Sequence, residues 1–268
     1  MSALGPLKNI LRESLLDLGL YHKINNLRFR NDARNKAQKE FYSRLIKPGD
    51  LVFDVGANIG QRSEIFAQLA HKVVAIEPQP NCVRHLRSRF RFNRRVVIQE
   101  VALGDKAGEA TMWQSASPGI SSMSRRFIDT MGSGVFRDEK WDKEIKVPTK
   151  TLDDLINTFG VPAFLKIDVE GYELKVLQGL TAAVPLISFE YSPEMIDETR
   201  NCAQRIQQVS TDYRFNYCLG EDLEFVLANH VDFETFMNRT LTEICTHNTF
   251  GDVYAMIEPG RRGKTNND

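Results

Sequence analysis

The ten residues Leu51-Val52-Phe53-Asp54-Val55-Gly56-Ala57-Asn58-Ile59-Gly60 decide the fold class of this chain. The first five form a short apolar run, which is typical of a strand buried on both faces of a parallel sheet. Residues 61–70, which follow the loop, have apolar side chains at helical spacing. A glycine directly after a strand lets a ligand approach the backbone, and the start of a helix offers unpaired N–H groups. The stretch therefore predicts a strand–loop–helix unit with a ligand at its loop.

The order of strand and helix repeats after this loop. Residues 73–77 form a second buried strand, and Pro78 ends it because proline has no backbone N–H to donate. A helix over 82–92 and a third strand over 96–98, continuing towards Ala102, complete three units. Units in this order give right-handed crossovers and a parallel sheet. Further strands are expected over 163–169, 186–191, 215–219 and 252–257, with helices over 151–156, 172–180 and 193–209.

The chain is expected to divide into three parts. Residues 1–46 carry leucines at helical spacing and predict an N-terminal helical cap, whose Lys and Arg residues leave a membrane-surface role open. Residues 47–258 form the α/β domain, with an insertion over 105–147. The insertion contains two extended segments, 109–114 and 144–147, separated by a Ser/Gly-rich stretch over 115–134 that is expected to be a mobile loop. Residues 259–268 are polar and are expected to be a disordered tail.

The composition restricts the class of protein. The chain has 268 residues, with 35 Lys and Arg against 35 Asp and Glu, so its net charge of zero does not favour nucleic acid or an anionic membrane as a partner of the whole molecule. Its four cysteines lack metal-like spacing, which favours free thiols in a reducing compartment. No apolar run approaches the length of about 20 residues that spans a bilayer, and the N-terminus lacks the pattern of a secretory signal. The expected location is the cytoplasm.

Asp54 indicates what the loop binds. The dinucleotide pattern G-x-G-x-x-G is not met, because Asn58 stands where the second glycine would be, although asparagine tolerates the left-handed conformation. A carboxylate at Asp54 would repel a pyrophosphate but suits a cationic amine. S-adenosylmethionine has an ammonium and a sulfonium and no phosphate. The chemistry favours this cofactor over NAD.

Glu77 supports the same assignment. It ends the second strand roughly 20 residues after the first glycine, where an acidic side chain can accept hydrogen bonds from both hydroxyls of a ribose. The two acids and the loop together predict a site for a nucleoside cofactor.

Several motifs together resemble the FkbM family of S-adenosylmethionine-dependent methyltransferases. The resemblance spans about residues 49–257, and its most specific part is Lys166-Ile167-Asp168-Val169-Glu170-Gly171. The motifs are residues 52–60, Ala75-Ile76-Glu77-Pro78, Ala102-Leu103-Gly104-Asp105, Thr151-Leu152-Asp153-Asp154 and 165–173.

The resemblance implies a fold, an activity and residue roles. The fold is a Rossmann-like class I methyltransferase sheet of seven mostly parallel strands with an antiparallel last strand, and the activity is mostly O-methylation of natural-product or sugar hydroxyls. Asp54 and Gly56 would hold the methionine part of the cofactor, Glu77 the ribose, and Ala102 the adenine. Asn58, Gly60 and Asp168 are counted with these cofactor-binding residues.

The end of the fourth strand carries the prediction about catalysis. Methyl transfer is an in-line displacement that requires alignment and removal of the hydroxyl proton. Asp168 is expected to be the base or to orient the hydroxyl. Lys166 lies on the same strand face and either polarises the acceptor or only pairs with a carboxylate. Glu190 ends the neighbouring strand, so it and Asp168 could share a divalent cation, but two carboxylates are too few and no metal is predicted. Glu170 is expected to support the loop or cap the next helix.

Two other classes of protein stay open. The arginines between Arg84 and Arg95 allow a nucleic-acid methyltransferase, although their spacing spreads the charges around a helix and favours a solvated face. The second alternative is a non-catalytic protein that binds S-adenosylmethionine. The preferred acceptor is a small molecule or a carbohydrate, and the oligomeric state does not follow from the sequence.

Overall fold

The computed structural model describes residue 16 and residues 33–221 and 223–257. The helices predicted before residue 33 and the tail predicted over 259–268 therefore lie outside the described residues, apart from Leu16. Among the described residues, no helix has both the length and the hydropathy that crossing a bilayer requires.

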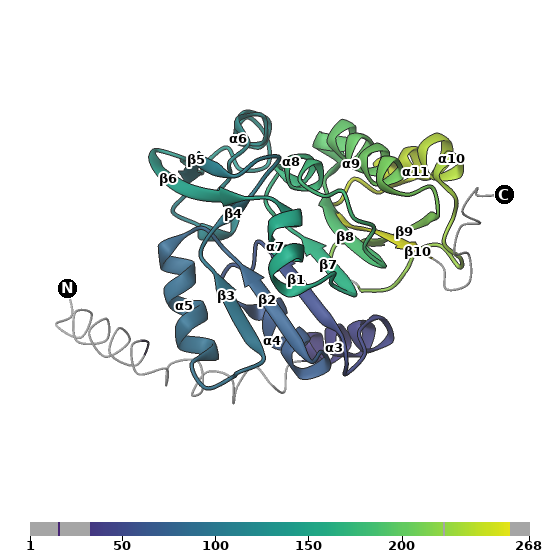
Figure 1. The fold of residues 1–268 in the computed structure, drawn as a ribbon. Coiled ribbons are helices and arrows are strands. Elements are labelled where there is room, and N and C mark those ends of the chain that lie inside the picture. The colour runs from purple at the N-terminus through teal and green to yellow at the C-terminus, as the bar shows by residue number, and fades with distance from the viewer. Residues whose placement is uncertain (1–15, 17–32, 222, 258–268) are drawn as a thin grey trace.

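A seven-stranded sheet forms the centre of the molecule, in the order β3-β2-β1-β7-β8-β10-β9 (Figure 1). Six of its strands run in the same direction, and β10 runs antiparallel to both of its neighbours. The predicted mostly parallel sheet with a reversed last strand is confirmed. The strands are β1 (Leu51–Val55), β2 (Lys72–Ile76), β3 (Val96–Gln99), β7 (Phe164–Ile167), β8 (Leu186–Tyr191), β9 (Tyr213–Leu219) and β10 (Gly251–Ile257).

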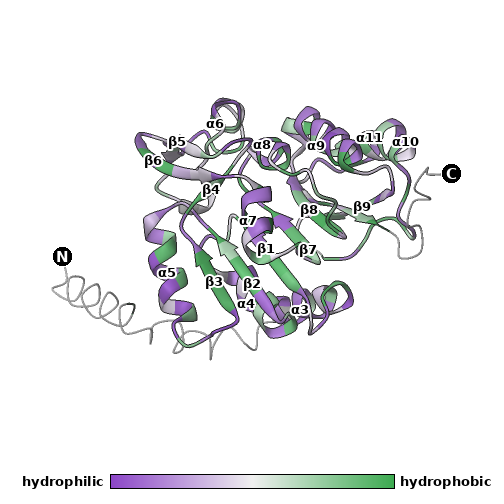
Figure 2. Cartoon of the chain, viewed as in Figure 1, coloured by the Kyte–Doolittle hydropathy of each residue, from purple (hydrophilic) through white to green (hydrophobic). Residues whose placement is uncertain are grey.

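Helices cover both faces of the sheet. The first face carries α3 (Ala33–Leu45), α4 (Gln61–Leu69) and α5 (Pro80–Phe90). The second face carries α7 (Leu152–Phe159), α8 (Glu173–Gln178), α9 (Ile196–Val209) and α11 (Leu241–His247). Figure 2 shows that the central strands are hydrophobic while the helices are mostly polar on the outside, as expected for strands buried on both faces.

Side chains alternate between these two faces along each strand, and the alternation positions the site. On β1, Phe53 and Val55 belong to the larger apolar core under α7, α8 and α9, whereas Val52 faces α3 and α4. Because the period of a strand is two residues, Asp54 lies on the face of α3 and α4. Lys166 follows the same rule on β7, where Phe164 faces α3 and Leu165 faces the larger core.

A second sheet of three strands, in the order β4-β6-β5, corrects the prediction for the third strand. The third strand ends at Gln99, and Ala102–Leu103 form β4, which pairs with β6 (Lys143–Lys150) rather than continuing β3. The extended segments predicted in the insertion are confirmed as β5 (Gly108–Gln114) and β6, which pair antiparallel. The two-residue strand could not be read from sequence because its partner lies about 50 residues away.

The stretch over 115–134, expected to be a mobile loop, contains helices. Residues Pro118–Ile120 form a 3-10 turn, and Arg125–Gly132 form α6, which Ser124 caps by accepting a hydrogen bond from Phe127 N. The apolar side chains of α6 pack on Met195 in the 3-10 turn Pro193–Met195. A Ser/Gly-rich composition conceals so short an amphipathic helix, and the prediction of a loop there is wrong.

The chain between β9 and β10 contains a helix that the sequence patterns did not predict. It consists of α10 (Phe233–Thr235), a π-helical turn (Phe236–Thr240) and α11, and it packs on the sheet through Phe236 and Ile244. By contrast, the predicted cap of α7 is confirmed. Thr151 Oγ1 accepts from Asp154 N, and the Asp154 carboxylate accepts from Thr151 N.

Candidate functional site

A cavity of about 870 Å³ opens at the carboxyl ends of β1, β2 and β7. This is the edge at which open α/β sheets bind ligands. The cavity is lined by predicted site residues from four separate parts of the chain, namely Asp54, Gly56, Asn58, Glu77, Ala102 and Asp168. The fold therefore brings together most of the residues predicted for the cofactor.

Three left-handed residues shape the glycine loop. Gly56, Asn58 and Gly60 have φ angles of 83°, 49° and 84°, which confirms that asparagine serves here in place of a glycine. A Cβ on Gly56 would lie 1.7 Å from the carbonyl oxygen of Asp168, and one on Gly60 would lie 2.7 Å from Leu86. Glycine is therefore required at position 56 because the loop packs against the residue that follows β7. This is a second reason for the glycine, beside the close approach of a ligand that the sequence predicts. Gly60 instead allows α4 to pack on α5 and does not line the cavity.

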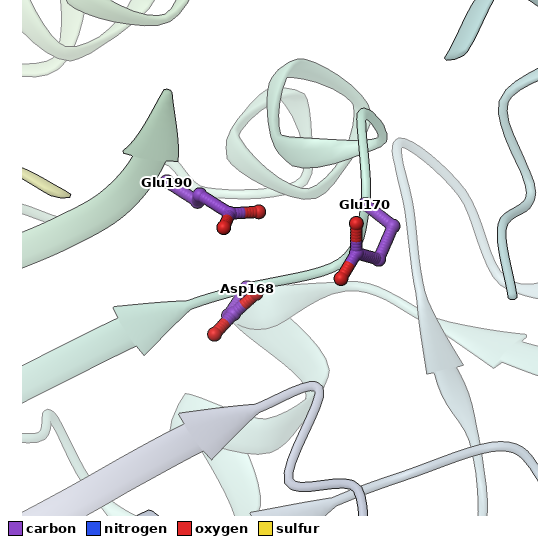
Figure 3. A group of neighbouring side chains, drawn as sticks. All are labelled: Asp168, Glu170 and Glu190. Carbon is purple, nitrogen blue, oxygen red and sulfur yellow. The ribbon is translucent and has the colours of Figure 1, made fainter. Parts of the chain in front are cut away.

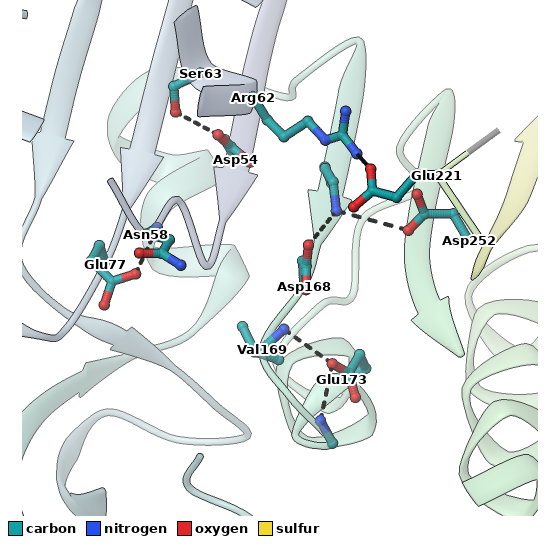
Figure 4. A network of polar contacts seen from close by, with 12 residues as sticks. Asp54, Asn58, Arg62, Ser63, Glu77, Asp168, Val169, Glu173, Glu221 and Asp252 are labelled. Atoms are coloured by element: carbon teal, nitrogen blue, oxygen red, sulfur yellow. Dashed lines mark hydrogen bonds and ion pairs between the residues drawn. The ribbon is translucent and has the colours of Figure 1, made fainter. Parts of the chain in front are cut away.

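Asp54 is buried with its carboxylate at the cavity. The Ser63 hydroxyl of α4 donates a hydrogen bond to Asp54 Oδ2 (Figure 4). Burial raises the Asp54 pKa, while the bond from Ser63 and the charge of Lys166 oppose that rise. An anionic Asp54 is thus costly without a cation close by. An ammonium group in the cavity would supply that cation.

Glu77 joins the end of β2 to the glycine loop. One carboxylate oxygen accepts from Asn58 N at 2.8 Å, and the other accepts from Gln79 N at 2.9 Å. Burial raises the Glu77 pKa to about 7, although these two backbone bonds lower it. A carboxylate offers about four acceptor positions. The two backbone N–H groups and a hydrogen bond from the Gln79 side chain use three of them, so Glu77 retains capacity for one hydroxyl donor.

Part of the cavity lining is apolar. Ala102 is buried and lines the cavity with Val101, Leu103 and Met112. Flat aromatic rings bind between such side chains, with polar groups at the edges fixing their orientation. The predicted adenine position at Ala102 thus has suitable surroundings, although β4 rather than β3 supplies it.

Lys166 is the centre of a buried ion-pair network on the face of α3 and α4, and its partners Asp168 and Asp252 are labelled in Figure 4. Its side chain is only 2% exposed, and Nζ lies 2.8 Å from Asp168 Oδ2 and 3.8 Å from Asp252 Oδ1. Burial disfavours the ammonium, yet the two carboxylates raise the Lys166 pKa well above its usual range. Lys166 is therefore a buried cation that pairs with carboxylates from β7 and β10.

Asp168 is held in its ionised form. Burial alone would raise its pKa, but the Lys166 ammonium, Arg62 and a hydrogen bond from Glu190 outweigh burial and hold the Asp168 pKa below its usual range. Its side chain remains 35% exposed, so the carboxylate is accessible from the cavity.

Glu190 and Glu170 complete a group of three carboxylates around Asp168 (Figure 3). One oxygen from each lies within 4.8 Å of the others. Burial and the charge of Asp168 raise the pKa of both glutamates well above the usual range, which favours their protonated forms. The three oxygens are also a ligand set that a hard divalent cation accepts. The sequence predicts only Asp168 and Glu190 together, and the structure adds Glu170.

Glu173, rather than Glu170, supports the loop after β7. Glu173 Oε1 accepts from Val169 N at 3.0 Å and from Gly171 N at 3.2 Å. Glu170 has a left-handed backbone with φ 55° and lines the cavity. The role predicted for Glu170 is wrong because this backbone directs its side chain to the carboxylate cluster, as Figure 3 shows.

Sequence reasoning missed Asp252 and the pair of Arg62 with Glu221. Asp252 lies opposite Glu190 in the antiparallel register of β10 and β8, and Arg62 Nη2 lies 2.8 Å from Glu221 Oε2. An acidic residue at the start of an otherwise apolar final strand was a visible signal for Asp252. The register that places it beside Lys166 was not visible.

The chain matches proteins whose activities are known. A family model described as the methyltransferase FkbM domain matches residues 54–228. The 31-O-demethyl-FK506 methyltransferase FkbM of Streptomyces tacrolimicus is 34% identical over 165 residues, covering 52% of this chain and 62% of that protein. The hexuronic acid methyltransferase AglP of Haloferax volcanii is 30% identical over 143 residues, covering 52% of this chain and 54% of that protein.

A third relative is more distant. The 2-O-methyltransferase NoeI of Sinorhizobium fredii is 26% identical over 167 residues, covering 59% of this chain and 68% of that protein. The chain thus spans less than two thirds of the length of the first two relatives. Because the family model covers the glycine loop, Glu77 and the carboxylate cluster in one continuous match, the chain belongs to the FkbM methyltransferase domain family.

Proposed function

We propose that this protein is an S-adenosylmethionine-dependent methyltransferase that methylates a hydroxyl group of a small molecule or carbohydrate. The observation that carries the proposal is the arrangement of Asp54, Glu77 and Asp168 around one cavity at the carboxyl edge of the sheet. These carboxylates suit a cationic nucleoside cofactor at one end and a hydroxyl acceptor at the other.

The residues present fit the cofactor. Asp54 and the loop at Gly56 and Asn58 would hold the methionine part, because the buried Asp54 carboxylate lacks a cation within hydrogen-bonding distance among the described residues. Glu77 would accept a hydrogen bond from a ribose hydroxyl, and Ala102 with Met112 would line the adenine. The bound cofactor supplies an electrophilic methyl group.

The chain's own residues then align the acceptor and take its proton. Asp168 is ionised and accessible, so it accepts the hydrogen bond of the acceptor hydroxyl and receives its proton as the new C–O bond forms. Lys166 keeps Asp168 ionised and fixes one of its oxygens at 2.8 Å. Glu190, whose pKa is raised by burial and by the charge of Asp168, donates a hydrogen bond to Asp168 in its protonated form.

The reaction is proposed to need no metal ion. Lys166 already supplies a positive charge beside Asp168, and the raised pKa values of Glu170 and Glu190 favour the protonated forms of these two side chains. A divalent cation at the three oxygens would compete with these protons and is the alternative that a chelator tests.

The proposed class of acceptor rests on the names of the three relatives. Their names describe methylation of 31-O-demethyl-FK506, of a hexuronic acid and of a 2-O position, which supports a hydroxyl on a natural product or sugar. Nucleic acid is not proposed as the acceptor, because Arg87 and Arg89 of the arginine-rich α5 are already in ion pairs with Glu100 and Glu64. We place the reaction in the cytoplasm, because all four cysteines are free thiols.

Cofactor affinity is expected to fall as the pH drops below about 7. The Glu77 pKa is raised to about 7, and only the ionised form offers both oxygens as acceptors to the backbone N–H groups and to a ribose hydroxyl. The dissociation constant, measured by calorimetry between pH 8 and pH 6, should therefore rise by up to about tenfold per pH unit below that pKa. The Glu77→Gln variant should bind more weakly and show a flat pH dependence. An equally steep dependence in that variant would assign the titration to another group.

A methyl-transfer assay tests the activity itself. The protein is incubated with methyl-labelled S-adenosylmethionine and a panel of sugars, uronic acids and polyketides, and the products are identified by mass spectrometry. Methyl transfer to a hydroxyl supports the proposal if this activity persists after chelator treatment. Activity that is lost with chelator and restored by Mg²⁺ would replace the metal-free mechanism, and cofactor binding with no transfer to any acceptor would favour a non-catalytic binding protein.

A further inference from the structure

We infer that Ser122, on the segment between β5 and α6, is a positioning residue that holds the carboxylate cluster in place. The inference rests on the proposed function, since it concerns the geometry in which Asp168 and Glu170 meet the acceptor. The segment lies in the insertion, to which no role was assigned from the sequence.

The backbone after Asp168 is strained. Glu170 and Gly171 both have left-handed φ angles, 55° and 82°. A glutamate adopts this conformation only where its surroundings fix it. Because Glu170 is two residues from Asp168, a change at this turn would move both carboxylates.

Ser122 supplies the fixing contact. Its hydroxyl donates to the carbonyl oxygen of Glu170 at 2.6 Å, and its side chain is fully buried. Ser122 is itself fixed, because its backbone N–H donates to Trp113 O at 3.0 Å and its carbonyl accepts from Trp113 N at 2.9 Å. The same hydroxyl accepts from Ser124 N at 2.9 Å. The donor therefore cannot follow the turn if the turn relaxes.

Two further contacts hold the turn. Phe127 of α6 packs so closely that a Cβ on Gly171 would lie 2.6 Å from Phe127 Cβ. Glu173 accepts from the N–H groups of Val169 and Gly171, as Figure 4 shows for Val169. Among these contacts, the Ser122 hydroxyl alone bonds to the Glu170 carbonyl, so its loss leaves that buried oxygen without this bond.

Ser122→Ala is expected to lower kcat by about 10- to 100-fold, the size of effect that displacement of a reacting group by about 1 Å produces. The dissociation constant for S-adenosylmethionine should change by less than about twofold, since the proposed cofactor residues Asp54, on β1, and Glu77, directly after β2, make no contact with this turn through Ser122. Hydrogen exchange should accelerate at the amides of residues 169–171 and stay unchanged in β1. Ser117→Ala is the matched control. Ser117 lies in the same segment as Ser122, but its hydroxyl donates to the Glu139 carboxylate and not to the turn after β7.

A pair of larger variants tests the hydroxyl if Ser122→Ala does not fold. Ser122→Thr and Ser122→Val add the same volume, but only threonine retains the donor. The inference predicts that the threonine variant keeps at least about tenfold more activity and slower exchange at 169–171. Equal behaviour of the two, or wild-type kcat and exchange in Ser122→Ala, would overturn it. Exchange needs no acceptor, so it decides this inference even if the protein transfers no methyl group.

Discussion

The Asp168→Asn variant is expected to bind S-adenosylmethionine nearly as well as the wild type and to turn over about 10²- to 10⁴-fold more slowly. Asparagine keeps the shape of the side chain and an oxygen for the hydrogen bond from Lys166 Nζ, which lies 2.8 Å from Asp168 Oδ2. It cannot accept the proton of an acceptor hydroxyl. Single-turnover rates at saturating cofactor, together with calorimetric affinity, measure the two effects separately.

Two other variants make this result specific. Asp105→Asn removes a carboxylate of an exposed pair with Lys175 and should leave turnover unchanged. Glu190→Gln replaces a carboxyl group whose raised pKa favours the protonated form, and glutamine keeps a donor for Asp168, so its loss of activity should be about tenfold or less. A greater loss in Glu190→Gln than in Asp168→Asn would make Glu190 the base. Equal losses of affinity and turnover in Asp168→Asn would make Asp168 a cofactor-binding residue.

Lys166→Met is expected to lower the free energy of unfolding by about 3–5 kcal/mol, because removing one partner of a buried ion pair leaves the others uncompensated. The carboxylates of Asp168 and Asp252 would both lose the ammonium that lies 2.8 and 3.8 Å away. Their pKa values would then rise in the folded variant. A folded state that binds more protons than the unfolded state loses stability as the pH rises, so the deficit should grow between pH 5 and pH 8.

Denaturant unfolding at several pH values measures this deficit. The matched control is Lys175→Met, which removes the same side chain from an exposed pair with Asp105 and should cost at most about 1 kcal/mol. A deficit in Lys166→Met that equals the control, or that shrinks as the pH rises, would mean that the buried carboxylates do not depend on Lys166.

Much of the fold could be predicted from local patterns. The apolar runs at 51–55, 186–191 and 252–257 match β1, β8 and β10 almost residue for residue, because strands buried on both faces need continuous apolar sequence. The predictions of secondary structure were wrong where a segment takes its structure from a neighbouring element that is distant in sequence. Ala102–Leu103 are a strand only because β6 lies beside them, and α6 is a helix in part because its apolar side chains have Met195 to pack against.

The candidate site likewise contains features that local sequence predicts and contacts that it does not. The glycine loop, Glu77 and the pair of Lys166 with Asp168 are short-range features, since strand ends and two-residue spacing place them without knowledge of distant contacts. Asp252 beside Lys166, and the Ser122 hydroxyl on Glu170, join segments that are far apart in the chain. Such contacts depend on strand register and on helix packing.

The sequence by itself therefore determined the class of sheet and the acidic residue types at its carboxyl edge. These properties follow from the periodicity of side chains and from residue chemistry at strand ends, which are local. Only the tertiary structure decided that Glu170 joins Asp168 and Glu190, that Lys166 is a buried cation with two partners, and that Ser122 of the insertion bonds to the Glu170 carbonyl. These features depend on burial and on distances between distant segments, and it is burial that sets which carboxylates are ionised.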